Sequence, residues 1–252
     1  MGFDLSGQAV LVTGAGRGIG QGTAELLAAS GAIVGVADID AATATRTAAA
    51  IIADGGQAHA LSGDVSTRAG FEAVAEAFAA RAGHIDAVIN AAMWIRYEPI
   101  EEVTDETFDR MLGVGLKAPV WGAQAVLRHM RTGQGGAVVN FSSPAADQGY
   151  PNTAVYAAVK GAVATITRSL AVELGARGVR VNAITPGPVP TPGARAVVDD
   201  AGYELRRRKT PLGRLGREAD IAQAIAFLLS AEASFITGVV LHVDGGCSIT
   251  AG

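Results

Sequence analysis

The glycine-rich turn Thr13-Gly14-Ala15-Gly16-Arg17-Gly18-Ile19-Gly20 follows a short apolar run and leads directly into a helical pattern. Glycines in such a turn let backbone N–H groups approach a diphosphate, whose charge then sits at the positive end of the helix. The spacing departs from the strict G-x-G-x-x-G pattern, because Ile19 takes the last glycine position with Gly18 and Gly20 on either side. The turn indicates a dinucleotide-binding strand–turn–helix unit, and a glycine-rich turn without a ligand is the alternative.

Asp38 ends the next apolar run, in VGVADID at residues 34–40. It lies close to the distance of about 20 residues at which an acid binds the adenosine ribose of a dinucleotide. A carboxylate there accepts hydrogen bonds from both ribose hydroxyls and repels a 2′-phosphate, so the sequence favours NAD over NADP. Two alternatives stay open. Asp38 could cap the following helix, as Asp40 could equally do, and Arg17 could bind a phosphate and weaken the preference for NAD.

Short β-branched runs alternate with longer, alanine-rich helical segments along almost the whole chain. Most of the runs are apolar at consecutive positions, which is typical of strands covered on both faces. The alternation predicts one doubly wound α/β domain of the Rossmann type over residues 1–252, with a seven-stranded parallel sheet and helices on both faces. The predicted strands are Ala9–Thr13, Ile33–Ala37, Ala58–Ser62, Ala87–Asn90, Ala137–Phe141, Arg180–Ile184 and Val239–Val243. The predicted helices are Ile19–Ser30, Ala41–Asp54, Arg68–Ala82, Asp105–Met130, Val155–Ala176 and Glu218–Leu229.

The 252 residues are 49% hydrophobic and 17% charged, with a net charge of −4. This composition is typical of a globular protein and excludes a disordered or fibrous one. The mild acidity argues against nucleic acid as a partner, and no apolar run approaches the roughly 18 residues of a membrane span. Cys247 is the single cysteine, which excludes an internal disulfide. We therefore expect a cytoplasmic protein without a nucleic-acid or membrane partner.

The segment 186–214 breaks the alternation of strands and helices. It opens with PGPVPTPG at residues 186–193 and contains the basic run Arg206-Arg207-Arg208-Lys209. Its length and composition predict a substrate lid. The basic run is interpreted as the solvated end of a helix, and an anion-binding role is the alternative.

Tyr156 and Lys160 lie four residues apart in YAAVK, so a helix would place them on one face. A nearby ammonium group favours the phenolate and lowers the pKa of tyrosine from its usual value of about 10, which makes Tyr156 a candidate general acid/base. Ser142 and Ser143 follow the apolar strand that ends at Phe141, at the edge of a parallel sheet where ligands bind. The four histidines are scattered without acids or thiols at ligand spacing, so no metal site is predicted.

Together these motifs resemble the short-chain dehydrogenase/reductase family in its single-domain form, and the resemblance covers essentially the whole chain. It implies an NAD-dependent oxidoreductase that interconverts a secondary alcohol and a ketone. It also implies a homotetramer built on the two longest predicted helices and the C-terminal strand region. The matching segments are TGAGRGIG at 13–20, Asp38, Asp64-Val65, INAA at 89–92, FSS at 141–143, YAAVK at 156–160, NAITPGPVPT at 182–191 and TGVVLHVDGG at 237–246.

The resemblance also implies a role for each matching residue. Tyr156 would act as the acid/base, Lys160 would lower its pKa and hold the nicotinamide ribose, and Ser143 would hydrogen-bond the substrate oxygen. Ser143 is preferred to Ser142 because it lies thirteen residues before Tyr156, the usual spacing of the family. The implied cofactor-binding residues are Gly14, Arg17, Gly18, Ile19, Gly20, Asp38, Asp64, Val65, Asn90, Tyr156, Lys160, Pro186, Val189 and Thr191.

Two positions depart from the family's pattern. The family usually has NNAG where this chain has Asn90-Ala91-Ala92-Met93, which changes a wall of the pocket. Gly115 stands where the family usually has an asparagine that supports a water chain to the lysine. These departures motivate one alternative, a protein that senses the dinucleotide without efficient turnover. A second alternative is a family member with a different reaction, such as dehydration or enoyl reduction.

The sequence describes the substrate pocket only in outline. Several apolar and aromatic residues follow the fourth predicted strand or lie near the catalytic strands, which favours an apolar, partly aromatic pocket, with ordinary packing as the alternative. Arg96 could meet an anionic substrate, although a lone arginine in a loop more often faces water. The pocket candidates are Met93, Trp94, Tyr97, Pro144, Tyr150 and Pro188.

Overall fold

A parallel sheet of seven strands runs through the middle of the protein, with the strand order β3-β2-β1-β4-β5-β6-β7. The computed structural model describes residues 2–131 and 133–250. Neighbouring strands are all parallel, so each connection has to cross over a face of the sheet. The strands are β1 (Ala9–Thr13), β2 (Ile33–Asp38), β3 (Gln57–Ser62), β4 (Ala87–Asn90), β5 (Gly136–Phe141), β6 (Val179–Pro186) and β7 (Val240–Val243).

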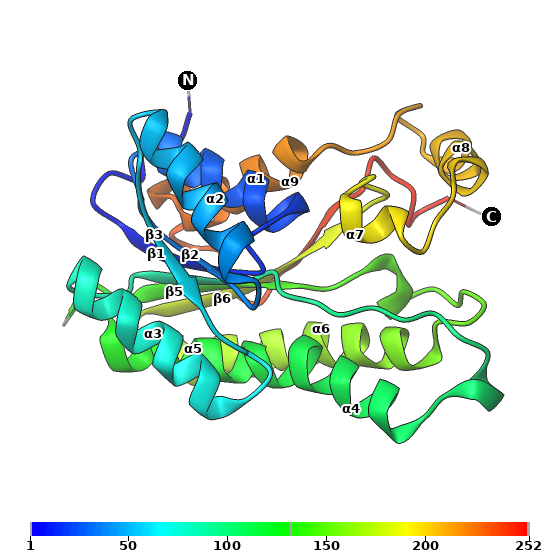
Figure 1. The fold of residues 1–252 in the computed structure, drawn as a ribbon, viewed down its shortest axis with the longest axis horizontal. Helices are drawn as coiled ribbons and strands as arrows, with labels where there is room; N and C mark the ends of the chain where they lie inside the picture. Colours follow the sequence, from blue (N-terminus) through cyan, green and yellow to red (C-terminus); the bar gives the residue numbers. More distant parts are fainter. Residues whose placement is uncertain (1, 132, 251–252) are drawn as a thin grey trace.

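Helices form a layer on each face of the sheet (Figure 1). One layer contains α1 (Gly18–Ala29), α2 (Ala41–Ala53) and α9 (Glu218–Leu229). The other contains α3 (Arg68–Ala82), α4 (Asp105–Leu112), α5 (Ala118–His129) and α6 (Ala154–Gly175). Two short helices, α7 (Pro192–Arg195) and α8 (Asp200–Lys209), lie beyond one end of the sheet, close to the C-terminal residues.

The two layers explain why the central strands are apolar on both faces. All residues of β1 and β4 are buried. One apolar core packs the first helix layer against the sheet through residues such as Leu27 and Ile221. The other packs the second layer through residues such as Phe71 and Phe78. The structure confirms the predicted doubly wound α/β fold with its seven-stranded parallel sheet.

The strand order reverses between β1 and β4, and this point positions the site. From β1 the chain winds outward through β2 to β3, and it then returns to β4 on the other side of β1. Ligands of such sheets bind in the crevice outside the carboxyl ends of the strands, where the order reverses. The glycine-rich turn leaves β1 at this end, directly before α1.

The prediction of one regular helix over Asp105–Met130 is wrong. The structure has α4, then a π-helical turn at Gly113–Lys117, and then α5, which ends at His129. Two of the five residues of this turn are glycines, which are poor formers of a regular α-helix. Single π-helical turns inside helices are frequent at functional sites. The other predicted elements differ from the observed ones by one or two residues at their ends.

α6 is long and apolar enough, by length and composition alone, to cross a membrane. In the fold it packs along β6. Its buried face includes Val155, Val159 and Val163, which follow one another at four-residue spacing. The apolar character of α6 is therefore that of a helix that packs on the core.

Candidate active site

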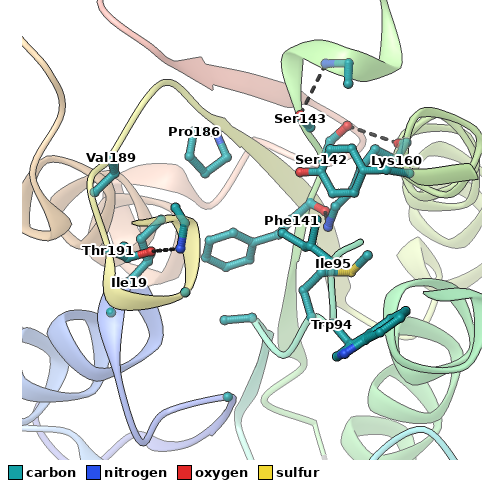
Figure 2. Close-up of a pocket in the computed structure, with 18 of the residues that line it drawn as sticks. Ile19, Trp94, Ile95, Phe141, Ser142, Ser143, Lys160, Pro186, Val189 and Thr191 are labelled. Carbon is teal, nitrogen blue, oxygen red and sulfur yellow. Dashed lines mark hydrogen bonds between the residues drawn. The ribbon is translucent and has the colours of Figure 1, made fainter. Parts of the chain in front are cut away.

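A cleft of about 1340 Å³ opens at the carboxyl ends of the strands. It is lined by the glycine-rich turn, the loops after β2 to β5, the start of α6 and the segment after β6. Figure 2 shows Phe141, at the end of β5, between Ile19 and Thr191 on one side and Ser142 and Lys160 on the other. The cleft exceeds the roughly 300–1,000 Å³ of ordinary small-ligand pockets, so it has room for a dinucleotide and a small substrate together.

The glycine-rich turn forms a cradle that side chains would fill. Gly14 has φ +65°, and a Cβ atom on it would lie 2.7 Å from the Cα of Ala92. Gly18 has φ +59° and faces Thr191, which begins the short helix α7. A Cβ on Gly20 would collide with the carbonyl group of Gly14. These close approaches within the chain require glycine, and the turn lines the cleft at the N-terminus of α1, where backbone N–H groups suit a diphosphate.

Asp38 faces the cleft at the end of β2 and is held there by the backbone. Its Oδ2 accepts a hydrogen bond from Gly16 N (2.9 Å), and its Oδ1 accepts one from Asp40 N (3.1 Å). Asp40 is the residue that caps α2, because its side chain accepts hydrogen bonds from the N–H groups of Ala42 and Thr43. Asp38 does not cap the helix, and its carboxylate borders the cleft as a ribose-binding acid would.

The other predicted cofactor residues mostly line the same cleft. Asn90 does not: its side-chain amide donates to Asn140 Oδ1 (2.9 Å), and that of Asn140 donates to Thr167 Oγ1 (3.0 Å), in a buried network. A contact from the backbone of Asn90 to the ribose stays a prediction. The residues that line the cleft as predicted are Arg17, Ile19, Asp64, Val65, Pro186, Val189 and Thr191.

This cleft fits a nicotinamide dinucleotide. The glycine cradle suits the diphosphate, the acid at the end of β2 suits a ribose, and the apolar residues Ile19, Pro186 and Val189 offer flat packing surfaces. No three His, Cys, Asp or Glu side chains within residues 2–131 and 133–250 are grouped as a bound metal ion requires. The groups that line the cleft are those that bind an organic cofactor.

Ser143, Tyr156 and Lys160 come together in this cleft. Ser143 follows β5, and its Oγ accepts a hydrogen bond from Ala145 N (3.2 Å). Tyr156 and Lys160 lie on the first turns of α6, with Lys160 Nζ 5.7 Å from the centre of the Tyr156 ring. Lys160 Nζ donates to the carbonyl oxygen of Phe141 (2.8 Å), and Ser142 Oγ donates to that of Lys160 (3.1 Å). These two bonds attach the start of α6 to the end of β5.

Burial controls the protonation of both ionisable groups. It raises the pKa of Tyr156 well above its usual value, and the neighbouring phenol of Tyr97 raises it further, whereas a hydrogen bond with Ser143 lowers it. Burial also lowers the pKa of Lys160 to about 8. The groups that shift the pKa of Tyr156 in the protein alone do not include the Lys160 ammonium, and its lowering of this pKa stays a prediction. Tyr156 holds its proton at neutral pH.

Comparison with known proteins agrees with this geometry. Residues 14–248 match the family described as enoyl-(acyl carrier protein) reductase, which is one of the short-chain dehydrogenases/reductases. The 4-formylbenzenesulfonate dehydrogenase of Comamonas testosteroni is 39% identical over 252 residues, covering 98% of this chain and 100% of the relative. The cyclopentanol dehydrogenase of Comamonas sp. is 34% identical over 244 residues, covering 96% and 97%. The chain belongs to the short-chain dehydrogenase/reductase family.

Solved structures of this family share the whole fold. A protein of Sinorhizobium meliloti 1021 has a TM-score of 0.94 and 37% identity, with 99% of both chains covered. A 3-ketoacyl-(acyl-carrier-protein) reductase from Brucella melitensis, complexed with NADH, has a TM-score of 0.90 and 37% identity, covering 97% of this chain and 100% of the other. A blue fluorescent protein from a metagenomic library, in complex with NADPH, has a TM-score of 0.89 and 32% identity, covering 97% and 99%. Relatives of this chain thus bind either nicotinamide dinucleotide.

The structure gives a packing reason for the departures at Met93 and Gly115. Gly115 lies in the π-helical turn, and a Cβ atom there would be 2.5 Å from Cγ1 of Val159 and 3.0 Å from the sulfur of Met93. Met93 and Val159 therefore occupy the space that a side chain at residue 115 would need. The two departures from the short-chain dehydrogenase/reductase pattern are coupled, since the thioether packs where the glycine leaves room.

The predicted apolar and aromatic wall lies in the cleft. Tyr97 is the nearest aromatic neighbour of Tyr156 in it, with ring centres 5.4 Å apart in an edge-to-face arrangement. Arg96 does not line the cleft and forms an ion pair with Glu98 (2.7 Å). The pocket candidates that line the cleft as predicted are Met93, Trp94, Tyr97, Pro144, Tyr150 and Pro188.

Several residues of the lid and of α4 line the cleft, and the sequence analysis did not predict them. The Arg110 guanidinium lies 4.4 Å from the centre of the Trp94 ring and borders the same wall. Tyr203 and Arg206 reach the cleft from α8. The basic run of α8 was a visible signal, but the sequence did not show which of its side chains faces inward.

Proposed function

We propose that this short-chain dehydrogenase/reductase uses NAD(H) to interconvert a secondary alcohol and a ketone. One observation carries the proposal: Ser143, Tyr156 and Lys160 share a cleft with the glycine cradle and Asp38. The named activity of the Comamonas relative on cyclopentanol, a secondary alcohol, supports the same reaction. Because the single cysteine, Cys247, forms no internal disulfide, we also propose a cytoplasmic location.

The catalytic groups are arranged for proton transfer to a carbonyl oxygen. In ketone reduction, the Ser143 hydroxyl donates a hydrogen bond to this oxygen, and Tyr156 gives it a proton as the carbonyl carbon is reduced. In alcohol oxidation, the ionised Tyr156 takes the hydroxyl proton. Lys160 has further N–H donors beyond the one bound to Phe141, and these would hold a ribose hydroxyl. A bound nicotinamide ring would supply or accept the hydride.

The preference for NAD rests on Asp38. Its carboxylate is fixed by two backbone N–H groups and borders the cleft. A fixed negative charge there accepts hydrogen bonds from ribose hydroxyls and repels a 2′-phosphate. Arg17, which also lines the cleft, stays the residue that would favour NADP.

The packing of Met93 argues against the alternative that this protein senses the dinucleotide without turnover. That alternative was motivated by Gly115, and the space taken by Met93 and Val159 explains the glycine without any loss of catalysis. Enoyl reduction, which the description of the matching family names, is a second candidate. Ser143 beside Tyr156 favours carbonyl chemistry, because a hydroxyl and a phenol converge on one oxygen atom.

The test is nicotinamide absorbance over a panel of cyclic, aromatic and aliphatic alcohols and ketones and an enoyl thioester, with NAD(H) and NADP(H) compared. The proposal expects turnover of at least one secondary alcohol or its ketone, with NAD(H) preferred. Reduction of an enoyl thioester without reduction of any ketone would contradict it, and so would a preference for NADP(H).

A further inference from the structure

The proposed reaction leaves the basic run of α8 without a role, and the structure divides this run in two. Tyr203, Arg206 and Lys209 all line the cleft. They are spaced three residues apart, which places them on one face of the helix. That face is turned toward the cleft, so two of the four cations border the space next to the catalytic residues.

The other two cations share one acid on the same helix. Arg207 Nε lies 2.8 Å from Glu204 Oε2, and Arg208 Nε lies 2.9 Å from Glu204 Oε1. All four cations of the run are exposed. Arg207 and Arg208 pair with Glu204, as in the solvated helix end that the sequence predicts, whereas Arg206 borders the cleft.

Arg206 lacks a carboxylate partner. No Asp or Glu in the described part of the chain lies within ion-pair distance of its guanidinium. Its Cζ lies 5.8 Å from the centre of the Tyr203 ring, and Arg195 Cζ lies 5.3 Å from the same ring. Stacking on an aromatic face orients a guanidinium and leaves its N–H donors for another group.

The catalytic end of the cleft is positively charged around Arg206. The acids among the described lining residues are Asp38 and Asp64, which lie after β2 and β3. Nearby, the Asp244 carboxylate accepts hydrogen bonds from the N–H groups of Gly246 and Ser248 in its own turn (2.9 Å each). Asp244 keeps its charge but does not line the cleft, so the lining residues around Arg206 and Lys209 include no acid of their own.

Arg206 lines the same cleft as three phenols, Tyr97, Tyr150 and Tyr156. Burial raises the pKa values of these phenols, and the charge of Arg206 opposes the increase in each.

Tyr203 adds a second unused polar group. It is 4% exposed, and its hydroxyl has no hydrogen-bond partner among the residues that the structure describes. A buried hydroxyl without a partner costs free energy. An oxygen-rich anion in the cleft would satisfy a phenol and a guanidinium together.

We propose that Arg206, assisted by Lys209 and Tyr203, binds an anionic group of the substrate. The substrate class is then a hydroxy or keto compound that carries a carboxylate or a sulfonate. This inference rests on the proposed function, because the anion is bound in order to present its own carbonyl or hydroxyl group to Ser143 and Tyr156.

The experiment is calorimetric binding to the NADH complex of the Tyr156→Phe variant, which holds ligands without turning them over. The probes are two matched sets: 4-acetylbenzoate and 4-acetylbenzenesulfonate against 4-methylacetophenone, and 4-oxopentanoate against 2-pentanone. We expect an anion to bind at least about tenfold more tightly than its neutral partner, as charge-assisted hydrogen bonds are stronger than neutral ones. Arg206→Met should remove this advantage and change the neutral ketone less than about twofold.

Arg208→Met is the matched control, because Arg208 lies on the same helix but pairs with Glu204. It should leave both classes of ligand unchanged. Equal binding of anions and neutral ketones, no anion binding at millimolar concentration, or equal losses in the two arginine variants would overturn the proposal. Weaker NADH binding in Arg206→Met would also overturn it, since Arg206 would then act on the cofactor.

The same variants separate this inference from the proposed function. Turnover is measured in the chain that retains Tyr156, whereas anion binding is measured in its absence. Anion binding lost in Arg206→Met, without any hydride transfer in the unmodified chain, would reject the function and keep the site. Ketone reduction that does not distinguish anionic from neutral substrates would reject the site and keep the function.

Discussion

At the scale of single residues, the chemistry depends on two neighbouring phenols. The ring of Tyr97 meets that of Tyr156 at 77°, with centres 5.4 Å apart. Burial and this neighbour together raise the pKa of Tyr156. A phenol that keeps its proton at neutral pH is suited to donate it to a carbonyl oxygen.

Replacing Tyr97 with Phe should shift the pH dependence of catalysis toward lower pH. Alcohol oxidation needs the ionised form of Tyr156, so its rate rises with pH through the pKa of that group. Tyr97→Phe removes a phenol that raises this pKa, and the rise in oxidation should then occur at lower pH. The measurement is kcat against pH. Tyr150→Phe is the control, and an unchanged profile in Tyr97→Phe would contradict the pairing of the phenols.

Replacing Gly115 with Asn should destabilise the protein and should not raise turnover. The new Cβ would lie 2.5 Å from Val159 Cγ1, and overpacking of this kind costs about 1–3 kcal/mol. Thermal unfolding should occur several degrees lower, and adding Met93→Gly and Val159→Ala should restore part of the loss. Gly175→Asn is the matched control, because nothing lies within 4 Å of a Cβ at that helical glycine. Higher activity in Gly115→Asn would mark Gly115 as an impairment instead.

At the scale of elements, the turn between β2 and α2 separates two acids with different tasks. Asp38 borders the cleft, and Asp40 caps the helix. Asp38→Asn removes the negative charge and keeps an oxygen that accepts a backbone N–H. The ratio of kcat/KM for NAD to that for NADP should fall by at least about tenfold, given the strength of hydrogen bonds to a charged group.

Asp40→Asn is the control for this turn. Asparagine caps helices as well as aspartate does, so neither stability nor cofactor preference should change. A shift in cofactor preference as large as that of Asp38→Asn would show that the general charge of the turn, and not the position of Asp38, controls selection.

Sequence reasoning located most elements to within one or two residues, because strands buried on both faces and alanine-rich helices have distinct patterns. It failed at the junction of α4 and α5. The π-helical turn there depends on the packing of Gly115 against Met93 and Val159, and contacts between distant segments leave no periodic signal. Sequence motifs also predicted Ser143, Tyr156 and Lys160 as a site, and these three residues line one cleft. The sequence showed Arg206 only as one of the four cations in the basic run. Which of these side chains borders the cleft depends on how α8 packs over it.

At the scale of the whole molecule, we expect a homotetramer with α5 and α6 in its interfaces. Val172 is 86% exposed on α6, and a large aliphatic side chain on the surface of a helix suits a subunit contact. Val172→Glu should reduce the assembly to dimers or monomers, as measured by light scattering after gel filtration. Ile52→Glu, at an exposed position of α2, should leave the assembly intact. A stable monomer for the unmodified chain would contradict the expectation.

The whole fold brings distant parts of the chain together in one cleft. The turn between β1 and α1 supplies the glycine cradle, the loop after β5 supplies Ser143, α6 supplies Tyr156 and Lys160, and the segment after β6 lines the same cleft. None of these parts forms the site alone, because they meet only at the carboxyl ends of the sheet. The account therefore depends on Tyr156 acting as the acid/base within this assembled cleft.

The most direct measurement is turnover of the best secondary alcohol by Tyr156→Phe, together with calorimetric binding of NADH to the same variant. General acid/base catalysis contributes about 10²- to 10⁴-fold to a rate, so kcat should fall by that range while the dissociation constant of NADH stays within about threefold. Phe keeps the ring and its packing, which preserves the cleft. Turnover close to that of the unmodified protein would contradict the account, because another group would then supply the proton.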